Sequence, residues 1–253
     1  MTSISRIKCF GLTIEGLPFD EILVRIQNYS ENRPYWIVTA NPEILLQARE
    51  DESYRKALAE ADVRICDSIG LKLCGLLQGK NLKRLTGVEL SEKLLHHANQ
   101  NSWSVAFVGG YGQVARQAYI RQMKTLPTLV GFVEQGGDVR DEGSGDMENN
   151  EARRRIAGQK PDMILVALGG TTKQELWIQK YRNEFPTAKV IIGIGGTFNY
   201  WAGIVKRAPS WMRAIGLEWL HRLIQEPTRR RRIWNAVVVF PAFFVMDLVR
   251  QRH

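Results

Sequence analysis

The alternation of short apolar runs with helix-length segments constrains the fold of this chain more than any other feature. Each run has four to six residues, is β-branched or aromatic, and is bounded by polar residues or glycine, so it predicts a buried strand. The six runs are residues 35–39, 63–66, 104–108, 129–133, 163–168 and 190–194. Helical patterns lie between them, at residues 43–60, 70–77, 87–99, 112–126, 148–158 and 173–185. The alternation predicts an α/β fold with a Rossmann-like, mostly parallel sheet and helices on both faces.

The size and composition of the chain fit one catalytic domain with an appendage. Its 253 residues, of which 44% are hydrophobic, can bury a substantial core and are too apolar for a disordered protein. After Gly196 the composition changes, because aromatic and basic residues are interleaved from there on. We therefore expect a catalytic core over residues 1–196 and a basic, aromatic C-terminal appendage over residues 197–253.

Cysteine usage and the first residues indicate the compartment. The three cysteines, Cys9, Cys66 and Cys74, are an odd number without CxxC spacing, so we expect a reducing compartment and no structural metal. The N-terminus has no basic segment followed by a long apolar run and a cleavage site. We therefore expect a cytoplasmic protein.

The positive charge is concentrated in the appendage. Residues 204–253 hold ten Lys or Arg against three acids and so carry +7 of the net charge of +9, which suggests an anionic partner such as phosphate, lipid or nucleic acid. Four arginines precede the 14-residue apolar run 233–246, which Asn235 and Pro241 interrupt. Spanning a bilayer takes about 20 residues, so we expect this run to be too short and to lie in the headgroup region of an anionic membrane surface. The alternative is packing on the core or on another subunit of a homo-oligomer.

Polar residues follow several predicted strands, whose carboxyl ends meet at one edge of a parallel sheet. Thr39 and Asn41 follow the first strand, Asp67 follows the second, and Arg84 precedes a Thr-Gly turn. Each has a structural alternative, because Thr39, Asn41 and Asp67 suit helix N-caps and Arg84 can pair with a surface acid. As functional residues, Asp67 would act as a general base and Arg84 would hold a phosphate.

Glycine-rich turns are the remaining candidates. The turn in VALGGTTKQELW leads into a helix whose first amides can receive an anion or a sugar hydroxyl, although ordinary turns also use glycine. The turns FVGGYGQ and GIGGTF lack the GxGxxG spacing, which counts against a dinucleotide dehydrogenase. We expect the acidic, Gly-rich stretch 134–150 to be a mobile surface loop.

Together these clusters resemble the signature of the WecG/TagA/CpsF family, glycosyltransferase family 26. The strongest match is residues 193–232, where GIGG, a Phe-containing turn, AGIVKRAP, GLEWLHRL and EPTR follow in order. The likeness continues back through KQE, FVGG, R-x-x-G, the strand-end Asp and T-x-N, and so covers nearly the whole chain. It implies a GT-E type fold with a C-terminal membrane-associating helical appendage. It also implies an inverting transfer from a UDP-sugar to a polyprenyl-diphosphate-linked sugar in bacterial cell-surface polysaccharide synthesis, with no cofactor and no required metal.

Position by position, the resemblance implies roles for individual residues, with Asp67 as the catalytic base. The residues that match the sugar site are Thr39, Asn41, Arg84, Gln174 and Glu175, and those that match the nucleotide or diphosphate site are Gly109, Gly110, Gly195, Gly196, Arg222, Arg229 and Arg232. The sequence departs from the family pattern at Ser68, usually Gly, at Thr172, usually Pro, and at Glu89 and Asn199, both often Asp. Because Ser68 adjoins the base, it bears on the choice of sugar.

An inverting transfer needs one base and no covalent intermediate, which a single strand-end carboxylate can supply. The leaving diphosphate needs a metal or cations to neutralise its charge. No DxD motif follows a strand, since Asp138 and Asp141 lie in the expected loop, so we favour arginines.

A nucleic-acid-binding module is a competing interpretation, but its arginines would form a compact face rather than adjoin an apolar run. A nucleotide-dependent oxidoreductase and a non-catalytic membrane scaffold are further alternatives, and the sequence leaves the donor sugar open.

Overall fold

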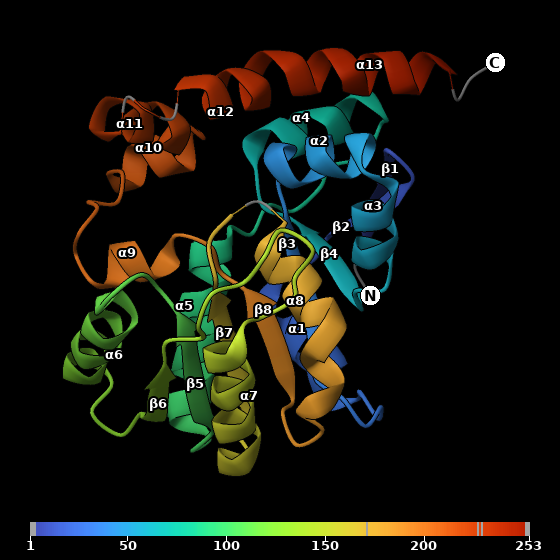
Figure 1. Ribbon diagram of the computed structural model, residues 1–253. Helices are drawn as coiled ribbons and strands as arrows, with labels where there is room; N and C mark the ends of the chain where they lie inside the picture. The colour runs from blue at the N-terminus through green and yellow to red at the C-terminus, as the bar shows by residue number, and fades with distance from the viewer. Residues whose placement is uncertain (1–3, 171, 227, 229, 251–253) are drawn as a thin grey trace.

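The computed structural model describes residues 4–170, 172–226, 228 and 230–250, and within them an eight-stranded sheet lies between layers of helices (Figure 1). The strands are β1 (Ser5–Cys9), β2 (Leu12–Gly16), β3 (Tyr35–Ala40), β4 (Val63–Cys66), β5 (Ser104–Gly109), β6 (Val130–Glu134), β7 (Met163–Ala167) and β8 (Val190–Gly193). Their order across the sheet is β1-β2-β4-β3-β8-β7-β5-β6. Only β1 is antiparallel to its neighbour among these described strands. The expected α/β class with a mostly parallel sheet is confirmed.

The N-terminal hairpin of β1 and β2 was not expected from the sequence pattern. Side chains of β1 alternate between the surface and the core, so no continuous apolar run marks this edge strand. Phe10 and Gly11 form a two-residue turn with φ values of 49° and 81°, the geometry of a tight hairpin turn that rarely takes a bulky first residue. The Phe10 ring packs edge-on against Phe240 near the C-terminus, with 5.9 Å between ring centroids, and this contact holds the turn in the core.

Helices occupy all six predicted segments, with one correction, whereas α1 and α9 lie outside the predicted segments. They are α1 (Phe19–Gln27), α2 (Pro42–Glu50), α3 (Glu52–Ala59), α4 (Ile69–Leu77), α5 (Gly87–Gln100), α6 (Val114–Thr125), α7 (Met147–Gln159), α8 (Lys173–Tyr181) and α9 (Thr197–Trp201). The expected single helix over residues 43–60 is wrong. Asp51 has an extended backbone between α2 and α3, and its side chain accepts the N–H of Tyr54 (3.0 Å). Asp51 therefore ends one helix and caps the next.

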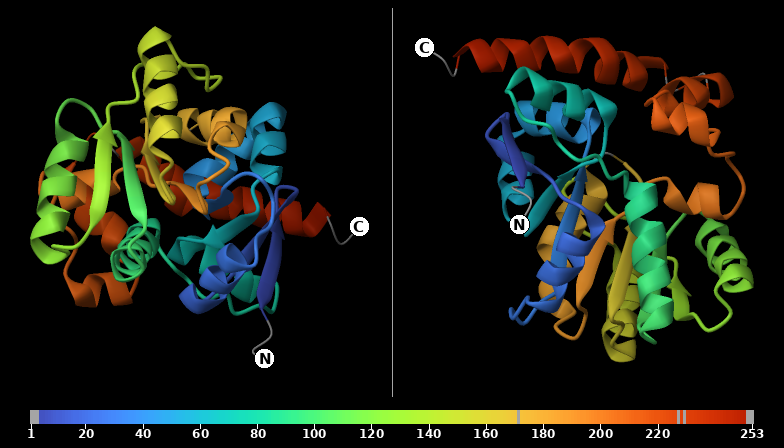
Figure 2. Two further views of the ribbon diagram at one scale, coloured as in Figure 1. Left: turned by 90° about the horizontal axis from the view of Figure 1, so that it is seen from below. Right: turned by 180° about the vertical axis from the view of Figure 1, so that it is seen from behind.

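Successive strand side chains point to opposite faces of the sheet, which produces two separate cores. On one face, Trp36 and Val38 of β3 belong to a core shared with α2, α3, α7 and α8. On the other face, Tyr35 and Ile37 belong to a core shared with α1, α5, α6 and α9. Figure 2 shows these layers on the two sides of the sheet. The prediction that helices cover both faces is confirmed.

The connections open a crevice at one edge of the sheet. β3 leads into α2 and α3 on one face, whereas its neighbour β8 leads into α9 on the other. Segments that leave adjacent strands toward opposite faces separate at the carboxyl edge, which is where open α/β sheets bind ligands. Thr39 lies near the end of β3, and Asn41, Gly195 and Gly196 follow these two strands, so the topology itself brings predicted site residues together.

The stretch 134–150 is tied to the core at several points and its last residues begin α7, so the prediction that it is a loop throughout is wrong. Val139 pairs with Gly145 in an isolated bridge, and Asn149 is completely buried. The Asn149 side chain donates to the Gly136 carbonyl and accepts the indole N–H of Trp177 (3.1 Å). A single buried amide therefore fixes a polar segment against α8, and composition alone does not reveal such a contact.

After α9 the chain forms helices that lie over the carboxyl ends of the strands (Figure 1). They are α10 (Ser210–Ala214), α11 (Glu218–Gln225), α12 (Arg230–Trp234), a π-helical turn (Asn235–Val239) and α13 (Phe240–Arg250). α9 packs into the core, because Phe198 is buried and stacks on Phe107 with 5.5 Å between centroids. The helical character of the C-terminal appendage is confirmed, whereas the domain boundary after Gly196 stays a prediction.

The C-terminal helix is longer than the sequence pattern indicates. Residues Arg230–Val249 form one helix of 20 residues, which continues past Pro241 and is long and apolar enough to cross a membrane. The expectation that the segment is too short is therefore wrong, although length and composition alone are weak grounds for a span. Phe240 and Phe244 are buried against the core, so core packing, the alternative that the sequence left open, describes one face of this helix.

Candidate active site

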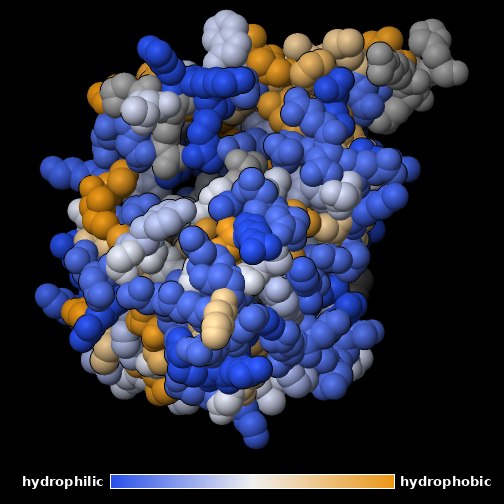
Figure 3. All heavy atoms as spheres, viewed as in Figure 1, coloured by the Kyte–Doolittle hydropathy of each residue, from blue (hydrophilic) through white to orange (hydrophobic). Residues whose placement is uncertain are grey.

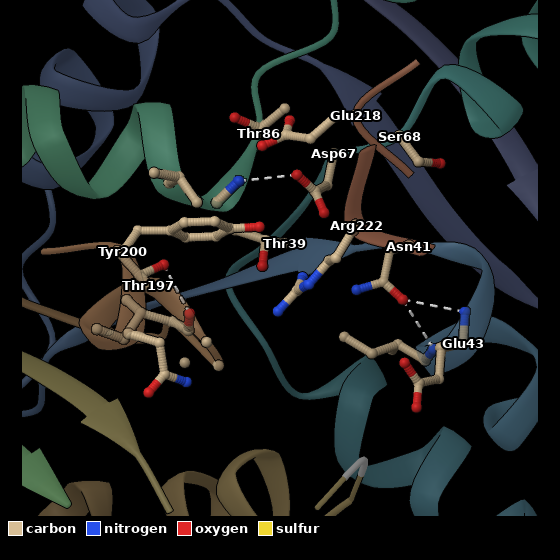
Figure 4. Close-up of a pocket in the computed structure, with 18 of the residues that line it drawn as sticks. Thr39, Asn41, Glu43, Asp67, Ser68, Thr86, Thr197, Tyr200, Glu218 and Arg222 are labelled. Carbon is tan, nitrogen blue, oxygen red and sulfur yellow. Dashed lines mark hydrogen bonds between the residues drawn. The ribbon is translucent and has the colours of Figure 1, made fainter. Parts of the chain in front are cut away.

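A cleft of about 580 Å³ lies between the carboxyl edge of the sheet and the appendage (Figure 4). Its walls come from segments far apart in the sequence, within residues 39–44, 67–69, 84–88, 110–114, 167–170, 193–200, 216–222 and 232–236, together with Gln174. Ten of the thirteen predicted site residues line it: Thr39, Asn41, Asp67, Arg84, Gly110, Gln174, Gly195, Gly196, Arg222 and Arg232. The fold thus gathers most of the predicted site at the topological crevice.

Asp67 lies in the cleft directly after β4. Its Oδ1 accepts the N–H of Gly87, the first residue of α5 (2.8 Å). Burial raises the pKa of Asp67 to about 7, with the Gly87 N–H and Arg84 opposing the rise and Glu218 adding to it. A carboxylate with a pKa near neutrality is matched to accepting a proton under physiological conditions.

Thr39 and Asn41 stand at the end of β3. Asn41 is the N-cap of α2, because its Oδ1 accepts two N–H groups of the first turn (3.0 and 3.1 Å), so the structural alternative for this residue is confirmed while its side chain also lines the cleft. Thr39 supports α5 instead, since a Cβ added to Gly87 would come within 3.2 Å of its Oγ1. Ser68 caps α4 by accepting the N–H of Leu71 (3.2 Å), which gives the departure from the family glycine a local structural role.

Gln174 and Glu175 occupy different positions in the site. The Gln174 side chain lines the cleft, donates from Nε2 to Glu175 Oε1 (2.7 Å) and accepts the N–H of Gly195 at Oε1 (3.2 Å). Glu175 is buried behind it and is not part of the cleft wall. Burial raises the pKa of Glu175 to about 7, against the hydrogen bond from Gln174. This position fits support of Gln174, and a contact of Glu175 with the sugar stays a prediction.

Arg222 extends from α11 into the middle of the cleft (Figure 4). Its Nε is buried and has no hydrogen-bond partner among the described residues, and the nearest acid, Glu226, is 3.7 Å away. The Tyr200 ring lies 5.4 Å from the guanidinium carbon. A Cβ on Gly196 would fall 2.8 Å from Arg222 Nη2, so the glycine makes room for this side chain. The guanidinium retains donors for an anion in the cleft.

Arg84 and Arg232, unlike the Arg222 Nε, donate hydrogen bonds within the protein. Arg84 Nη2 donates to the carbonyl of Arg213 (2.9 Å), so it connects the sheet edge to the appendage. Arg232 lines the cleft and forms an ion pair with Glu43 of α2. Arg229 lies outside the described residues. Arg84 and Arg232 therefore both hold the appendage in place and contribute positive charge to the cleft.

The predicted glycines serve two different purposes. Gly109 has a φ of 90°, and a Cβ there would lie 2.4 Å from the carbonyl oxygen of Ala167 on β7. It lines a second, smaller cavity rather than the cleft, so its role is close packing of β5 on β7. Gly110 and Gly195 do line the cleft, and Gly195 has open space where a Cβ would be. The glycine loops thus leave the cleft wide at this edge.

Some residues of the cleft were not singled out from the sequence. Glu218 of α11 and Thr86 at the start of α5 lie beside Asp67, and Tyr200 lies across from it (Figure 4). Glu218 precedes Arg222 by four residues, so the helical period places both on one face. That spacing is the signal that would have identified Glu218.

The described residues hold no group of three His, Cys, Asp or Glu side chains that could bind a metal ion. Asp138 and Asp141 do not line the cleft, and Asp141 instead lies 3.6 Å from Lys173 Nζ. The cleft therefore combines one carboxylate of raised pKa, polar side chains from three strand ends, and guanidinium groups from the appendage. Such a set can accept a proton on one wall and stabilise a leaving anion on the other.

Comparison with known proteins agrees with this chemistry. The chain matches the model of the glycosyl transferase WecG/TagA/CpsF family over residues 7–253. It is 38% identical over 223 residues to an N-acetylglucosaminyldiphosphoundecaprenol N-acetyl-beta-D-mannosaminyltransferase of Bacillus spizizenii, a match that covers 88% of this chain and 82% of the relative. Proteins of the same name from Bacillus subtilis and Staphylococcus aureus are 32% and 28% identical, over 86% and 90% of this chain and 80% and 88% of the relatives. The chain is a glycosyltransferase and belongs to the WecG/TagA/CpsF family.

Proposed function

We propose that the protein transfers a sugar from a UDP-sugar to a polyprenyl-diphosphate-linked sugar, with inversion, on the inner face of the bacterial cell membrane during polysaccharide synthesis. The observation that carries the proposal is the pairing of Asp67 on the sheet edge with Arg222 on the appendage across one cleft (Figure 4). The names of the relatives specify an N-acetylmannosaminyl group and an N-acetylglucosaminyl-diphospho-undecaprenol acceptor. We take both as the first substrates to test.

In the proposed reaction, Asp67 takes the proton of the acceptor hydroxyl as its oxygen attacks the anomeric carbon. The bond from that carbon to the diphosphate breaks at the same time, and UDP leaves with the electron pair. One base suffices, because a nucleoside diphosphate needs no proton to depart once its charge is neutralised. The pKa of about 7 lets Asp67 be deprotonated before the attack and still hold the proton afterwards.

Arg222 is the proposed partner of the departing diphosphate. Its buried Nε has no hydrogen-bond partner among the described residues, and a guanidinium with spare donors binds phosphate oxygens in charge-assisted, bidentate geometry. Arg84 and Arg232 add positive charge at the ends of the cleft. Thr39, Asn41 and Gln174 are the proposed contacts of the transferred sugar.

The exposed side chains support docking on an anionic membrane. Twelve of the nineteen exposed large hydrophobic residues in the described part of the chain lie on α4 or between Trp211 and Val249. On the C-terminal helix, Phe240 and Phe244 face the core while Val245 and Val249 are exposed, so the helix presents an apolar outer face above the cleft. Figure 3 shows apolar atoms along this edge with hydrophilic atoms beside them. A helix that keeps its inner face on the core suits the membrane surface better than a span.

Helix α4 extends the same face. It packs beside α13 (Figure 1), and Leu73, Leu76 and Leu77 are each more than half exposed. Exposed apolar side chains flanked by arginines favour the interface of an anionic bilayer. This orientation turns the cleft toward the membrane, where a lipid-linked acceptor would be found.

The family membership favours this enzyme over a nucleic-acid-binding module, an oxidoreductase or a non-catalytic scaffold. A thermal unfolding screen with UDP-N-acetylmannosamine, UDP-glucose and UDP-glucuronic acid tests the donor class. A donor at 100 times its Kd should raise the free energy of unfolding by about 2.7 kcal/mol, and Arg222→Ala should reduce that effect while Asp67→Asn retains it. Stabilisation by RNA or by nicotinamide cofactors, with no response to any UDP-sugar, would contradict the proposal.

A further inference from the structure

A cluster of ion pairs joins the appendage to the first turns of α5. Arg207, which precedes α10, donates from Nη1 to both carboxylate oxygens of Glu92 (2.9 Å each). Its Nη2 lies 3.7 Å from Glu89 Oε1, and its Nε lies 3.8 Å from Glu218 Oε1. Arg207 therefore connects α5 to α11, the helix that also holds Arg222.

Glu89 serves the helix cap and the appendage at once. Its Oε2 accepts the N–H of Thr86 and its own N–H donates to Thr86 Oγ1, both at 3.3 Å, which is a reciprocal capping box. Its Oε1 faces Arg207 and, at 4.0 Å, Nη1 of Arg213. The Glu89 carboxylate thus accepts a backbone N–H at the start of α5 and also pairs with two arginines of the appendage.

Gly87, which lies within this capping box, holds the proposed base Asp67. Gly87 lies between Thr86 and Glu89, and its N–H donates to Asp67 Oδ1 (2.8 Å). The turn has little room to move, because a Cβ on Gly87 would already lie 3.2 Å from Thr39 Oγ1. A second link to the appendage, the hydrogen bond from Arg84 to the Arg213 carbonyl, lies just before Thr86 in the sequence.

We propose that Glu89 is a positioning residue that couples docking of the appendage to the orientation of Asp67. When the appendage is docked, Arg207 and Arg213 hold the Glu89 carboxylate, the carboxylate holds the capping turn, and the turn presents the Gly87 N–H to Asp67. The appendage therefore brings Arg222 into the cleft and fixes the base in the same movement. This inference rests on the proposed function of Asp67.

Two matched substitutions on α5 test the coupling. Glu89→Gln keeps an acceptor for the Thr86 N–H but removes the charge that faces Arg207 and Arg213. Glu92→Gln removes the closer partner of Arg207, one turn further along the helix, without touching the capping box. Glu89→Asp restores a carboxylate at the same position and should recover activity if the charge is what matters.

The readouts are kcat, KM for the donor, and the pH profile of kcat/KM in the full-length enzyme. We expect Glu89→Gln to lower kcat about 10-fold with little change in KM, because a small displacement of a catalytic group is costly for the chemical step. We also expect its acid limb to move to higher pH, because loss of the Gly87 hydrogen bond raises the pKa of Asp67 by more than loss of the Glu89 charge lowers it. In Glu92→Gln the acid limb should stay where it is in the wild type.

The possible outcomes separate this inference from the proposed function. If Asp67→Asn is inactive but Glu89→Gln matches the wild type in kcat and acid limb, the coupling is refuted and the base stands. Equal shifts of the acid limb in Glu89→Gln and Glu92→Gln would also refute it, because then only the loosening of the appendage matters. Equal turnover by the wild type and Asp67→Asn would overturn both.

Discussion

Docking of the C-terminal helix on the core should depend on one aromatic side chain. Phe244 is 1% exposed, and its ring centroid lies 6.2 Å from that of Phe240, which in turn packs on Phe10. Replacing a fully buried Phe by Ala removes its transfer free energy and leaves a cavity, at a cost of about 3–5 kcal/mol. Because this ring packs on the core from the C-terminal helix, we assign the free-energy cost of Phe244→Ala to docking of this helix. Even about 3 kcal/mol shifts the docking equilibrium about 100-fold.

Hydrogen exchange measures this shift directly. In Phe244→Ala, amides of the Arg230–Val249 helix should exchange about 100-fold faster than in the wild type, while those of β3 and β8 should not change. Val245→Ala is the matched control, because Val245 is the next residue and is 46% exposed, and such surface changes usually stay within about 0.5 kcal/mol. Equal protection of the helix in Phe244→Ala and the wild type, or equal loss in both variants, would refute the reasoning.

Four further predictions concern the site and its surroundings. The raised pKa of Asp67 predicts that kcat/KM falls about tenfold per unit as pH drops below about 7. Between the ordinary pKa of an aspartate and pH about 7, Asp67 is protonated in the folded state but ionised in the unfolded state. The free energy of unfolding therefore falls as pH rises through this window. Asp67→Asn should therefore raise Tm at pH 8 and have less effect at pH 4, and no difference between these pH values would contradict the raised pKa. Arg222→Lys should lower kcat about 10-fold or more, because an ammonium cannot reproduce the bidentate geometry, and unchanged kinetics would exclude Arg222 from the leaving-group site. Leu73→Gln combined with Leu77→Gln should weaken cosedimentation with anionic vesicles but retain turnover of a water-soluble acceptor, and unchanged sedimentation would remove α4 from the membrane face.

The sequence predicts the central strands well and the edge of the sheet poorly, for a physical reason. β3, β7 and β8 are buried on both faces and so read as continuous apolar runs. β1 is an edge strand with alternating exposure and offers no such run. Pro241 was taken as an interruption of the apolar run 233–246, yet the helix continues through it, and it follows a π-helical turn, where the shifted hydrogen-bond register suits a residue without an N–H.

The candidate site also has residues that the sequence predicts and contacts that it does not. Asp67 could be predicted because it follows a predicted strand, and the carboxyl ends of parallel strands meet at one edge of the sheet. Arg222 could be predicted because it lies in the motif GLEWLHRL. The excess of positive charge in the appendage was attributed to an external anion, but Arg207 and Arg213 face Glu89 and other acids of the protein itself. Internal ion pairs of this kind depend on tertiary contacts more than 100 residues apart in sequence, and no local pattern records them.

The most direct test of the account is the turnover of Asp67→Asn with a UDP-sugar donor and a lipid-diphosphate-linked acceptor. The substitution preserves shape and the hydrogen bond from Gly87 but removes the proton acceptor. We predict that kcat falls about 100-fold or more while the donor stabilises the variant against unfolding as it does the wild type. A kcat near that of the wild type would show that Asp67 is structural and would remove the base from the proposed mechanism.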